Sequence, residues 1–529
     1  MLFIASRRIS DASRAVLALL VFLASACTSK DSSNCTSLAN LKLPGTTITR
    51  AATEYPPFSL PDPPAPPGEI SVPICRVQGI IKPTADSSIR FEVWLPLSGW
   101  NGKYLGLGSG GLAGAIHYHE LAKALSSGYA TSGTDDGHPG NQADGGYGTD
   151  GSWALGHPSR VIDYGYRAVH ETAEKSKAIV ATFYGRSARR AYFEGCSEGG
   201  REALMEAQRF PADYDGLIAG APINAFTHFM DGILSIEQAL AEPGGYVAPK
   251  KLPVIEAAIE SACDALDGVK DGIVSEPMKC QFDPSVLLCK GAETDRCLTA
   301  AQIAALKKIY AGPSDSGGLP IFPGLEPSAY VLGGWAGWVS GSTPGKSILM
   351  SLVNGYFANF VFENPKWNFR NFDWDKDVRL SDEKSGAVLN ATSPDLNRFE
   401  AGGGKLLIYH GWADEVVAPR ASIDYYQGVA AAMGGAEKTA TFARLFMVPG
   451  MEHCGGAGSG PSVIDATATM DRWMETGAAP EQMIATKYVD DDPAGAVAMA
   501  RPVCAYPRIA RYKGAGDPNL ADSFECRKR

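Results

Sequence analysis

The sequence predicts an α/β fold in which a mostly parallel β-sheet carries helices on both faces and is interrupted by a large insertion. Short apolar or β-rich runs recur along the chain, and stretches with apolar residues at helical spacing lie between several of them. This alternation stops between residues 225 and 385, where cysteines, prolines and aromatic residues gather. With 529 residues, 45% of them hydrophobic, the chain can bury a large core. We therefore expect a core in two parts, residues 75–224 and 386–529, with the insertion as a lid domain over the site.

The expected strands are short and rich in apolar or β-branched residues. They lie at residues 89–95, 103–107, 129–134, 191–194, 216–219, 405–409 and 445–448. Helices are expected at residues 159–183, 199–209 and 421–433. Helices placed between successive strands are typical of a parallel sheet, because each crossover must return the chain to the same edge.

Residues 1–26 have the form of a secretory signal peptide. Three arginines precede an apolar run at residues 15–23. The run is too short to span a bilayer. Ala24 and Ala26 suit ordinary cleavage before Cys27, but the same stretch also approximates a bacterial lipobox, in which Cys27 would carry lipid. We expect an exported protein that is periplasmic, extracellular or an outer-membrane lipoprotein. Residues 27–74 then form an N-terminal extension.

Ten of the eleven cysteines remain when Cys27 is set aside, an even number in a chain expected to reach an oxidising compartment. Sequence alone leaves the connectivity open, and spacing suggests five disulfides: Cys35–Cys75, Cys196–Cys454, Cys263–Cys280, Cys289–Cys297 and Cys504–Cys526.

Charge and motif content argue against several classes of function. The formal net charge is −10, which disfavours a nucleic-acid partner. Neither CxxC nor HExxH occurs, which disfavours zinc ribbons, thioredoxin-like redox sites and zinc peptidases.

Residues 195–199, Gly-Cys-Ser-Glu-Gly, fit the G-x-S-x-G nucleophile elbow, a sharp turn between a strand and a helix. An expected strand precedes them and an expected helix follows, which is the context that the motif requires. The turn would project the Ser197 hydroxyl from the sheet edge, while the glycines let strand and helix approach closely. The Glu198 amide would lie at the helix N-terminus, where it can point at a developing oxyanion. The alternative is a chance match in a chain with 59 glycines.

A second oxyanion donor should come from a glycine-rich loop after an earlier strand. Residues 106–111, Gly-Leu-Gly-Ser-Gly-Gly, fit that place; the Gly111 amide is the expected donor and the Gly110 amide is the alternative. The same segment matches G-x-G-x-x-G, but the residues after Gly111 are weak as the start of a phosphate-binding helix, which disfavours a dinucleotide site.

An acid and a histidine should follow the serine in that order along the chain. Asp414 comes just after the expected strand 405–409, and His453 follows the expected strand 445–448. The carboxylate would fix the imidazole tautomer, and the imidazole would take the Ser197 proton and return it to the leaving alcohol. Glu415 is the alternative acid, although Asp414 is closer to the strand end.

Two further groups of polar residues near these motifs are expected to have structural roles. His410 is expected to support the loop of Asp414 by a hydrogen bond. Asp135, Asp136 and His138 stand in glycine-rich surroundings, which favours a structural loop.

Arg370, Arg379 and Arg398 are candidates for binding a substrate carboxylate on charge alone.

The cysteines at positions 196 and 454 adjoin the candidate nucleophile and the candidate base. If Ser197 and His453 come within hydrogen-bond reach, their sequence neighbours can approach to the Cα separation that a disulfide tolerates. A Cys196–Cys454 bridge would therefore clamp the elbow to the loop of the histidine; two unrelated thiols are the alternative.

Residues 263–273 have the composition of a calcium loop. Asp264, Asp267 and Asp271 supply carboxylates, glycines permit tight turning, and the carbonyls of Val269 and Ile273 could complete a shell of hard oxygen ligands. The pattern is not an EF-hand, because no bidentate Glu stands at the twelfth position. We expect a structural Ca²⁺ in the lid; an Asp- and Gly-rich solvated turn is the alternative.

Segments 195–201, 213–222, 410–414 and 453–454 closely resemble those of the tannase and feruloyl esterase family, and the resemblance covers about residues 75–526. It implies an α/β-hydrolase core, a large lid holding a structural Ca²⁺, and hydrolysis of esters of aromatic acids. The residues that it carries over are the triad Ser197, Asp414 and His453, the Glu198 amide of the oxyanion hole, and the calcium ligands Asp264, Asp267, Val269, Asp271 and Ile273.

The leading hypothesis is a serine carboxylic-ester hydrolase that forms an acyl-enzyme. Its partner is a small aromatic ester with a phenolic, feruloyl, galloyl or terephthaloyl acyl group. No nucleic acid is expected to bind, and the protein would contact a membrane only through a lipid at Cys27. The alternatives are a serine peptidase on the same core and a non-catalytic lipoprotein that binds polyphenol or carbohydrate.

Overall fold

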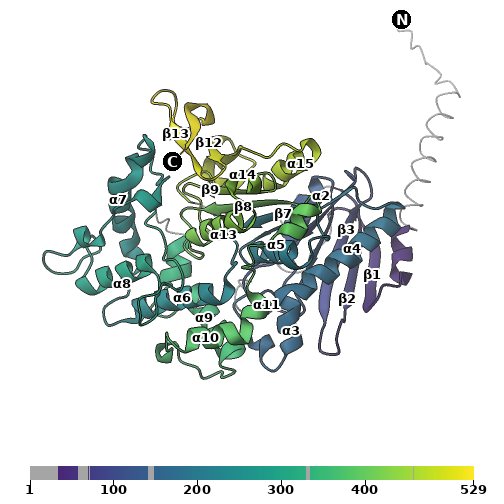
Figure 1. The fold of residues 1–529 in the computed structure, drawn as a ribbon, viewed down its shortest axis with the longest axis horizontal. Coiled ribbons are helices and arrows are strands. Elements are labelled where there is room, and N and C mark those ends of the chain that lie inside the picture. Colours follow the sequence, from purple (N-terminus) through teal and green to yellow (C-terminus); the bar gives the residue numbers. More distant parts are fainter. Residues whose placement is uncertain are drawn as a thin grey trace, which may run out of the picture.

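The computed structural model describes residues 34–57, 70, 72–140, 148–328, 334–456 and 458–528. The expected signal peptide and Cys27 lie outside these ranges. A nine-stranded sheet runs through the described molecule, and a group of helices lies at the side away from edge strand β1 (Figure 1).

The sheet is mixed, with strand order β1-β2-β3-β5-β4-β6-β7-β8-β9. The three pairs among its first four strands are antiparallel, and the five pairs from β5 onward are parallel. The strands are β1 (Thr46–Glu54), β2 (Ile74–Ile81), β3 (Ile89–Pro96), β4 (Lys103–Leu107), β5 (Ala130–Thr134), β6 (Arg190–Cys196), β7 (Gly216–Gly220), β8 (Lys405–Gly411) and β9 (Ala443–Val448).

All seven expected strands are present within a few residues of the predicted bounds, whereas β1 and β2 were not predicted. Part of the segment expected as an N-terminal extension is therefore the edge strand of the main sheet. β2 lacks a continuous apolar run because Arg76 is buried in it, paired with Glu92 of β3 at 2.7 Å. A buried ion pair of this kind breaks the hydrophobic pattern by which strands are recognised.

Helices cover both faces of the sheet, which confirms the predicted α/β class. One face packs on α4, α5 and α13, and the other packs on α2 and α15. Because successive strand residues point to opposite faces, they pack into two separate hydrophobic cores. The helices of the core are α2 (Tyr118–Ser126), α3 (Pro158–Ile162), α4 (Ala168–Tyr184), α5 (Glu198–Arg209), α13 (Arg420–Ala432), α14 (Ala436–Thr439) and α15 (Ala466–Thr476).

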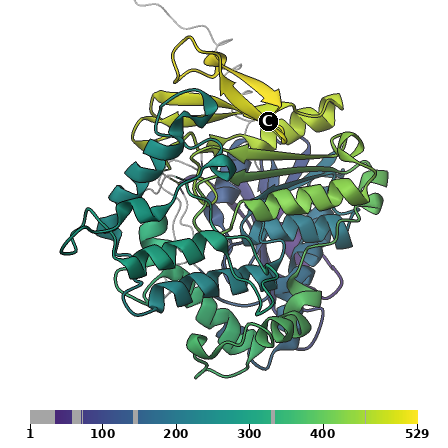
Figure 2. The same ribbon diagram turned by 60° about the vertical axis from the view of Figure 1, so that its left-hand side comes forward.

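Between β7 and β8 the described chain consists of helices joined by loops. Figure 2 shows its helices grouped beside the sheet, and a third hydrophobic core joins them to Val416, Val417 and Ala421 in and after the loop that follows β8. No helix within the described ranges is both long and apolar enough to cross a bilayer. The helices are α6 (Phe226–Ala241), α7 (Leu252–Cys263), α8 (Ala300–Ala311), α9 (Ile348–Tyr356), α10 (Asp377–Ser381), α11 (Ala387–Leu389) and α12 (Asn397–Ala401).

Two small antiparallel sheets near the C-terminus were not predicted. One contains β10 (Val463–Ile464), β11 (Gln482–Tyr488) and β12 (Val497–Cys504); the other contains β13 (Arg508–Tyr512) and β14 (Phe524–Lys528).

Five disulfides join the described cysteines, in the pairs that spacing suggested. Cys35–Cys75 fastens the N-terminal segment to β2, and Cys504–Cys526 joins the two C-terminal sheets.

Candidate functional site

The turn between β6 and α5 has the geometry of a nucleophile elbow. Ser197 lies at φ 62° and ψ −117°, a backbone conformation that costs a non-glycine residue about 1–3 kcal/mol. The Ser197 amide donates to the Gly220 carbonyl at 2.9 Å, and the Ser197 carbonyl accepts from the Ile223 amide at 3.3 Å. These bonds to the end of β7 and the segment after it hold the serine in the strained conformation.

Glycines allow the strand and helix to approach at this turn. A Cβ atom on Gly195 would lie 2.5 Å from the Gly199 carbonyl group, and one on Gly200 would lie 2.3 Å from the Gly220 oxygen. Either contact would push α5 away from the sheet, so the motif's glycines are required by packing.

Ser197 and His453 line the same cavity, which has a volume of about 650 Å³. Gly110 and Gly111 line it as well, and so does Trp338 from the inserted helices. The Trp338 ring meets the His453 ring edge to face, with centroids 5.9 Å apart. The cavity is therefore bounded by the elbow, the histidine, the glycine-rich loop and the insertion.

Asp414 is the carboxylate that contacts the imidazole of His453. The distance between His453 Nδ1 and Asp414 Oδ2 is 2.8 Å. The other carboxylate oxygen, Oδ1, accepts from the amides of Val416 and Val417, both at 2.8 Å. His410 lies within hydrogen-bond distance of Asp414 Oδ2, at 3.1 Å, so it supports this loop as expected.

The surroundings keep Asp414 ionised. Burial acts to raise its pKa, but the adjacent His453 and His410, by charge and hydrogen bonding, hold the pKa of Asp414 well below its usual value. Burial instead raises the pKa of Glu415 well above its usual value, with further contributions from Asp414 and Glu452. Glu415 faces the backbone amide of His453, at 3.4 Å, so the two alternative acids occupy different positions around the histidine.

The Cys196–Cys454 disulfide joins the residues adjacent to Ser197 and His453. Its Cα atoms are 5.8 Å apart across a sequence separation of 258 residues. The elbow and the histidine loop are thus fastened to each other covalently as well as by packing.

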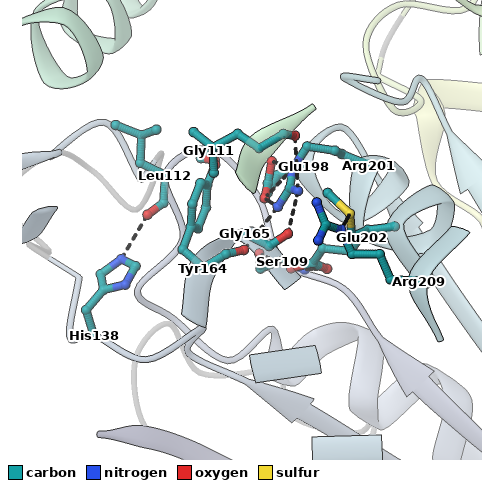
Figure 3. Close-up of polar contacts among 12 residues, drawn as sticks. Ser109, Gly111, Leu112, His138, Tyr164, Gly165, Glu198, Arg201, Glu202 and Arg209 are labelled. Atoms are coloured by element: carbon teal, nitrogen blue, oxygen red, sulfur yellow. Dashed lines mark hydrogen bonds and ion pairs between the residues drawn. The ribbon is translucent and has the colours of Figure 1, made fainter. Parts of the chain in front are cut away.

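The glycine-rich loop after β4 is attached directly to α5. The Gly199 amide donates to the Ser109 carbonyl at 3.0 Å. The Tyr164 hydroxyl, from the segment before α4, donates to the Gly111 carbonyl at 2.9 Å (Figure 3). Helix α2 begins only at Tyr118, so no helix opens at Gly111 as a dinucleotide fingerprint would require. Glu198 is the first residue of α5, which leaves its amide at the helix N-terminus beside Ser197.

Three contacts near the site were not predicted. Trp338 comes from the insertion, whose aromatic residues the sequence could not rank. Glu202 binds Ser109, and Glu198 pairs with the fully buried Arg201 (Figure 3). The only sequence signal for these partners is the recurrence of charged residues on the buried side of α5, at positions three and four apart.

The cluster of Asp135, Asp136 and His138 lies in the buried loop after β5. Asp135 accepts hydrogen bonds from Arg90, and a ring nitrogen of His138 lies 2.9 Å from the Leu112 carbonyl oxygen. Burial lowers the pKa of His138 to about 3, so its ring is neutral. These contacts agree with the structural loop that the sequence suggested.

The candidate calcium loop forms a tight turn after α7. Asp264 accepts from the amides of Asp271 and Gly272 at 3.2 and 3.1 Å, and Asp267 accepts from the Val269 amide at 3.1 Å. Asp271 is ion-paired with Arg501 of β12. Across the described part of the chain, no group of three or more His, Cys, Asp or Glu side chains is arranged to hold a metal ion. The donor atoms suit calcium, but Arg501 would have to release Asp271 for an ion to bind.

Arg370, Arg379 and Arg398 are all exposed, and none is among the described residues that line the cavity of Ser197. The positions suggested by charge alone are therefore not next to the candidate nucleophile.

Comparison with known proteins gives consistent results. The family model described as tannase and feruloyl esterase matches residues 75–527. An uncharacterised esterase of Xanthomonas campestris pv. campestris is 41% identical, with 94% of this chain and 92% of that protein covered. Mono(2-hydroxyethyl) terephthalate hydrolase of Piscinibacter sakaiensis is 36% identical, with 83% and 81% covered. The crystal structure of feruloyl esterase B from Aspergillus oryzae superposes with a TM-score of 0.84 at 27% identity, covering 94% of this chain and 100% of that one.

Proposed function

Because this chain belongs to the tannase and feruloyl esterase family, whose members are α/β-hydrolase esterases, we propose that it hydrolyses esters of aromatic acids with Ser197 as its nucleophile. One observation carries the assignment of the serine. Ser197 and His453 line one cavity, Asp414 contacts the imidazole, and the neighbours of the first two are disulfide-bonded.

In the proposed reaction, His453 Nε2 takes the Ser197 hydroxyl proton while the serine oxygen attacks the ester carbonyl. The carbonyl oxygen becomes an oxyanion, which the amides of Glu198 and of Gly111 or Gly110 stabilise. Collapse of this intermediate expels the alcohol, which receives the proton from His453, and leaves the aromatic acid esterified to Ser197. Water, deprotonated by the same histidine, then releases the acid.

Asp414 serves this cycle through the imidazole. Its carboxylate lies at Nδ1, so it fixes the tautomer in which Nε2 is free to accept the serine proton. The negative charge also stabilises the imidazolium that forms in both steps.

The cavity supports an aromatic substrate. Trp338, Tyr409 and Tyr488 line it, and aromatic rings stack favourably on such side chains. The test is a panel of methyl ferulate, methyl gallate, chlorogenate and mono(2-hydroxyethyl) terephthalate with the purified protein, with release of the acid as the readout. Hydrolysis of at least one ester supports the proposal. Cleavage of peptides but of none of the esters would favour a serine peptidase, and no turnover of either would favour a binding lipoprotein.

We also propose that the protein works outside the cytoplasm, because five disulfides are typical of exported proteins. The intact mass of the mature chain distinguishes a lipid on Cys27 from simple cleavage before it.

A structural Ca²⁺ in the loop of Asp264, Asp267 and Asp271 is a further part of the proposal. Three carboxylates in one turn supply the oxygen donors that Ca²⁺ prefers, and a bound ion would compete with Arg501 for Asp271. We expect chelation by EDTA to lower the unfolding temperature, and added Ca²⁺ but not Mg²⁺ to restore it. At a free Ca²⁺ concentration of 100 times Kd the stabilisation is about 2.7 kcal/mol.

The matched variants for this test are Asp267→Asn, in the loop, and Asp283→Asn, on an exposed lid residue that pairs with Lys307. Asp267→Asn should abolish the Ca²⁺-dependent shift, and Asp283→Asn should retain it. A wild-type unfolding temperature that Ca²⁺ and EDTA leave unchanged would exclude the ion.

Removal of the Cys196–Cys454 disulfide is expected to reduce both stability and activity. The chain-entropy model gives about 5 kcal/mol for a loop of this length and about 2.5 kcal/mol for the short Cys289–Cys297 loop. The control is therefore the Cys289→Ala/Cys297→Ala variant, whose bridge lies in the lid. Both double variants should lower the denaturant midpoint, but only Cys196→Ala/Cys454→Ala should lower kcat under conditions in which the protein stays folded. Equal kcat values would show that the bridge has no positioning role.

A further inference from the structure

The loop that carries the second candidate oxyanion donor is held by one buried carboxyl group. Glu202 lies on α5, four residues after Glu198, and is 2% exposed. Its Oε2 accepts from the Ser109 amide and its Oε1 accepts from the Ser109 hydroxyl, both at 3.0 Å (Figure 3). Ser109 directly precedes Gly110 and Gly111, so Glu202 joins the donor loop to the helix that begins beside Ser197.

A second carboxyl group, that of Asp136 in the loop after β5, interacts electrostatically with Glu202. It is fully buried at a φ of 56°, and in the described structure neither of its carboxylate oxygens meets hydrogen-bond geometry with a partner. A buried, unpaired carboxylate is costly, and a second carboxylate nearby adds repulsion. A proton on one of the two groups removes both penalties.

The nearest buried cation does not neutralise Glu202 or Asp136. Arg201, also fully buried, donates from Nε to both carboxylate oxygens of Glu198 at 2.9 Å, and its remaining nitrogens donate to backbone carbonyls, including those of Gly165 and Tyr164. Its charge is thus matched by Glu198 and leaves Glu202 and Asp136 as an acid pair. The titratable groups that face the pair are Glu198, Arg201 and Glu206 on α5 and Tyr164.

We propose that Glu202 is a positioning residue for the oxyanion loop, and that a proton shared with Asp136 maintains its hold on Ser109. This inference rests on the proposed function only for its kinetic readout. It assigns no contact with substrate to either carboxyl group; both act through the position of the Gly110 and Gly111 amides. Oxyanion donors must lie within a few tenths of an ångström of their working position, so a loosened loop lowers kcat more than it raises KM.

The raised pKa values of Glu202 and Asp136 also favour a protonated pair. Burial raises the pKa of Glu202 to about 7, with a further contribution from Glu198, and burial raises the pKa of Asp136 well above its usual value. Both pKa values exceed those of the unfolded chain, so the folded protein binds more protons and its stability falls as pH rises from about 4.3 to 7. The first of the pair's two protons leaves near pH 7, and when the second leaves, at higher pH, two like charges face each other and kcat should decline.

The experiment compares wild type with Glu202→Gln, Asp136→Asn and the matched control Glu206→Gln. Glu206 lies one turn further along α5, is equally buried at 1% exposure, and makes no hydrogen bond to Ser109 in the described contacts. Each variant is assayed from pH 5 to 9 for kcat and KM on a turned-over ester, and for the rate at which a fluorophosphonate labels Ser197. Labelling also depends on the oxyanion hole but not on the choice of ester.

For Glu202→Gln we expect kcat and the labelling rate to fall by about tenfold or more with KM nearly unchanged, because the amide cannot accept from both Ser109 donors. For Asp136→Asn we expect the alkaline decline of kcat to disappear, because the asparagine cannot ionise and can donate to the Glu202 carboxylate at every pH. Glu206→Gln should match wild type in both respects.

A wild-type kcat for Glu202→Gln, or an unchanged pH profile for Asp136→Asn, would overturn the inference. If Glu202→Gln does not fold, as judged by its thermal transition, Ser109→Ala replaces it, because that variant removes only the hydroxyl contact and should still lower the labelling rate. A protein that is labelled at Ser197 but hydrolyses none of the esters would refute the proposed function and leave the labelling comparison intact.

Discussion

Ser197→Ala is expected to lower kcat for aromatic ester hydrolysis by about 10⁶-fold, the loss seen when the nucleophile is removed from an enzyme of this kind. The hydroxyl is the only group at the elbow that could form the acyl-enzyme, and an alanine there retains the backbone bonds to Gly220 and Ile223. The fold should therefore persist, with an unfolding temperature close to that of wild type.

The measurement is steady-state turnover together with mass spectrometry after fluorophosphonate treatment. Wild type should gain one adduct on the peptide that contains Ser197, and Ser197→Ala should gain none. Retention of more than a small fraction of activity by the alanine variant would exclude Ser197 as the nucleophile and reopen the binding-protein hypothesis.

The second large effect is expected at the acid of the triad. Asp414→Asn should lower kcat by about 10⁴-fold, because an amide at His453 Nδ1 favours the wrong imidazole tautomer. Glu415→Gln is the matched control, since it removes the adjacent buried carboxyl group, which accepts from the backbone amide of His453 rather than contacting its ring nitrogen. Burial raises the pKa of Glu415 and so disfavours its charged form, in contrast to Asp414, so the amide variant should keep most of the activity.

Comparable kcat losses in the two variants would show that sequence position and geometry had singled out the wrong carboxylate. A larger loss in Glu415→Gln would assign the role to Glu415. Both variants require a thermal transition near that of wild type, because each removes a buried ionisable group.

The parallel part of the fold could be predicted because its strands are almost uniformly buried. Every residue of β4, β5 and β7 is buried, and their sequences are short runs of apolar, small or β-branched residues between helical patterns. β2 was not predicted because one of its buried residues is Arg76, which is paired with Glu92. β1 was not predicted because it is a partly exposed edge strand that is defined by its pairing with β2.

The same distinction applies to the site. Ser197, Asp414 and His453 could be proposed because each follows a strand at a place fixed by the fold's topology, and the adjoining cysteines marked two of them. Glu202 could not, because its partner Ser109 lies 93 residues away and neither residue belongs to a local motif that predicts the contact. Trp338 could not be chosen from the lid's aromatic residues, since packing requires most of them as well.

The bridge between Cys196 and Cys454 closes a covalent ring that includes the entire inserted domain, because both of its connections to the sheet lie between those two positions. Any rearrangement of the insertion must therefore take place within a loop whose ends are tied together. A shift of the insertion therefore leaves the elbow of the serine and the loop of the histidine joined to each other, while Trp338, which comes from the insertion, can change its contact with the His453 ring.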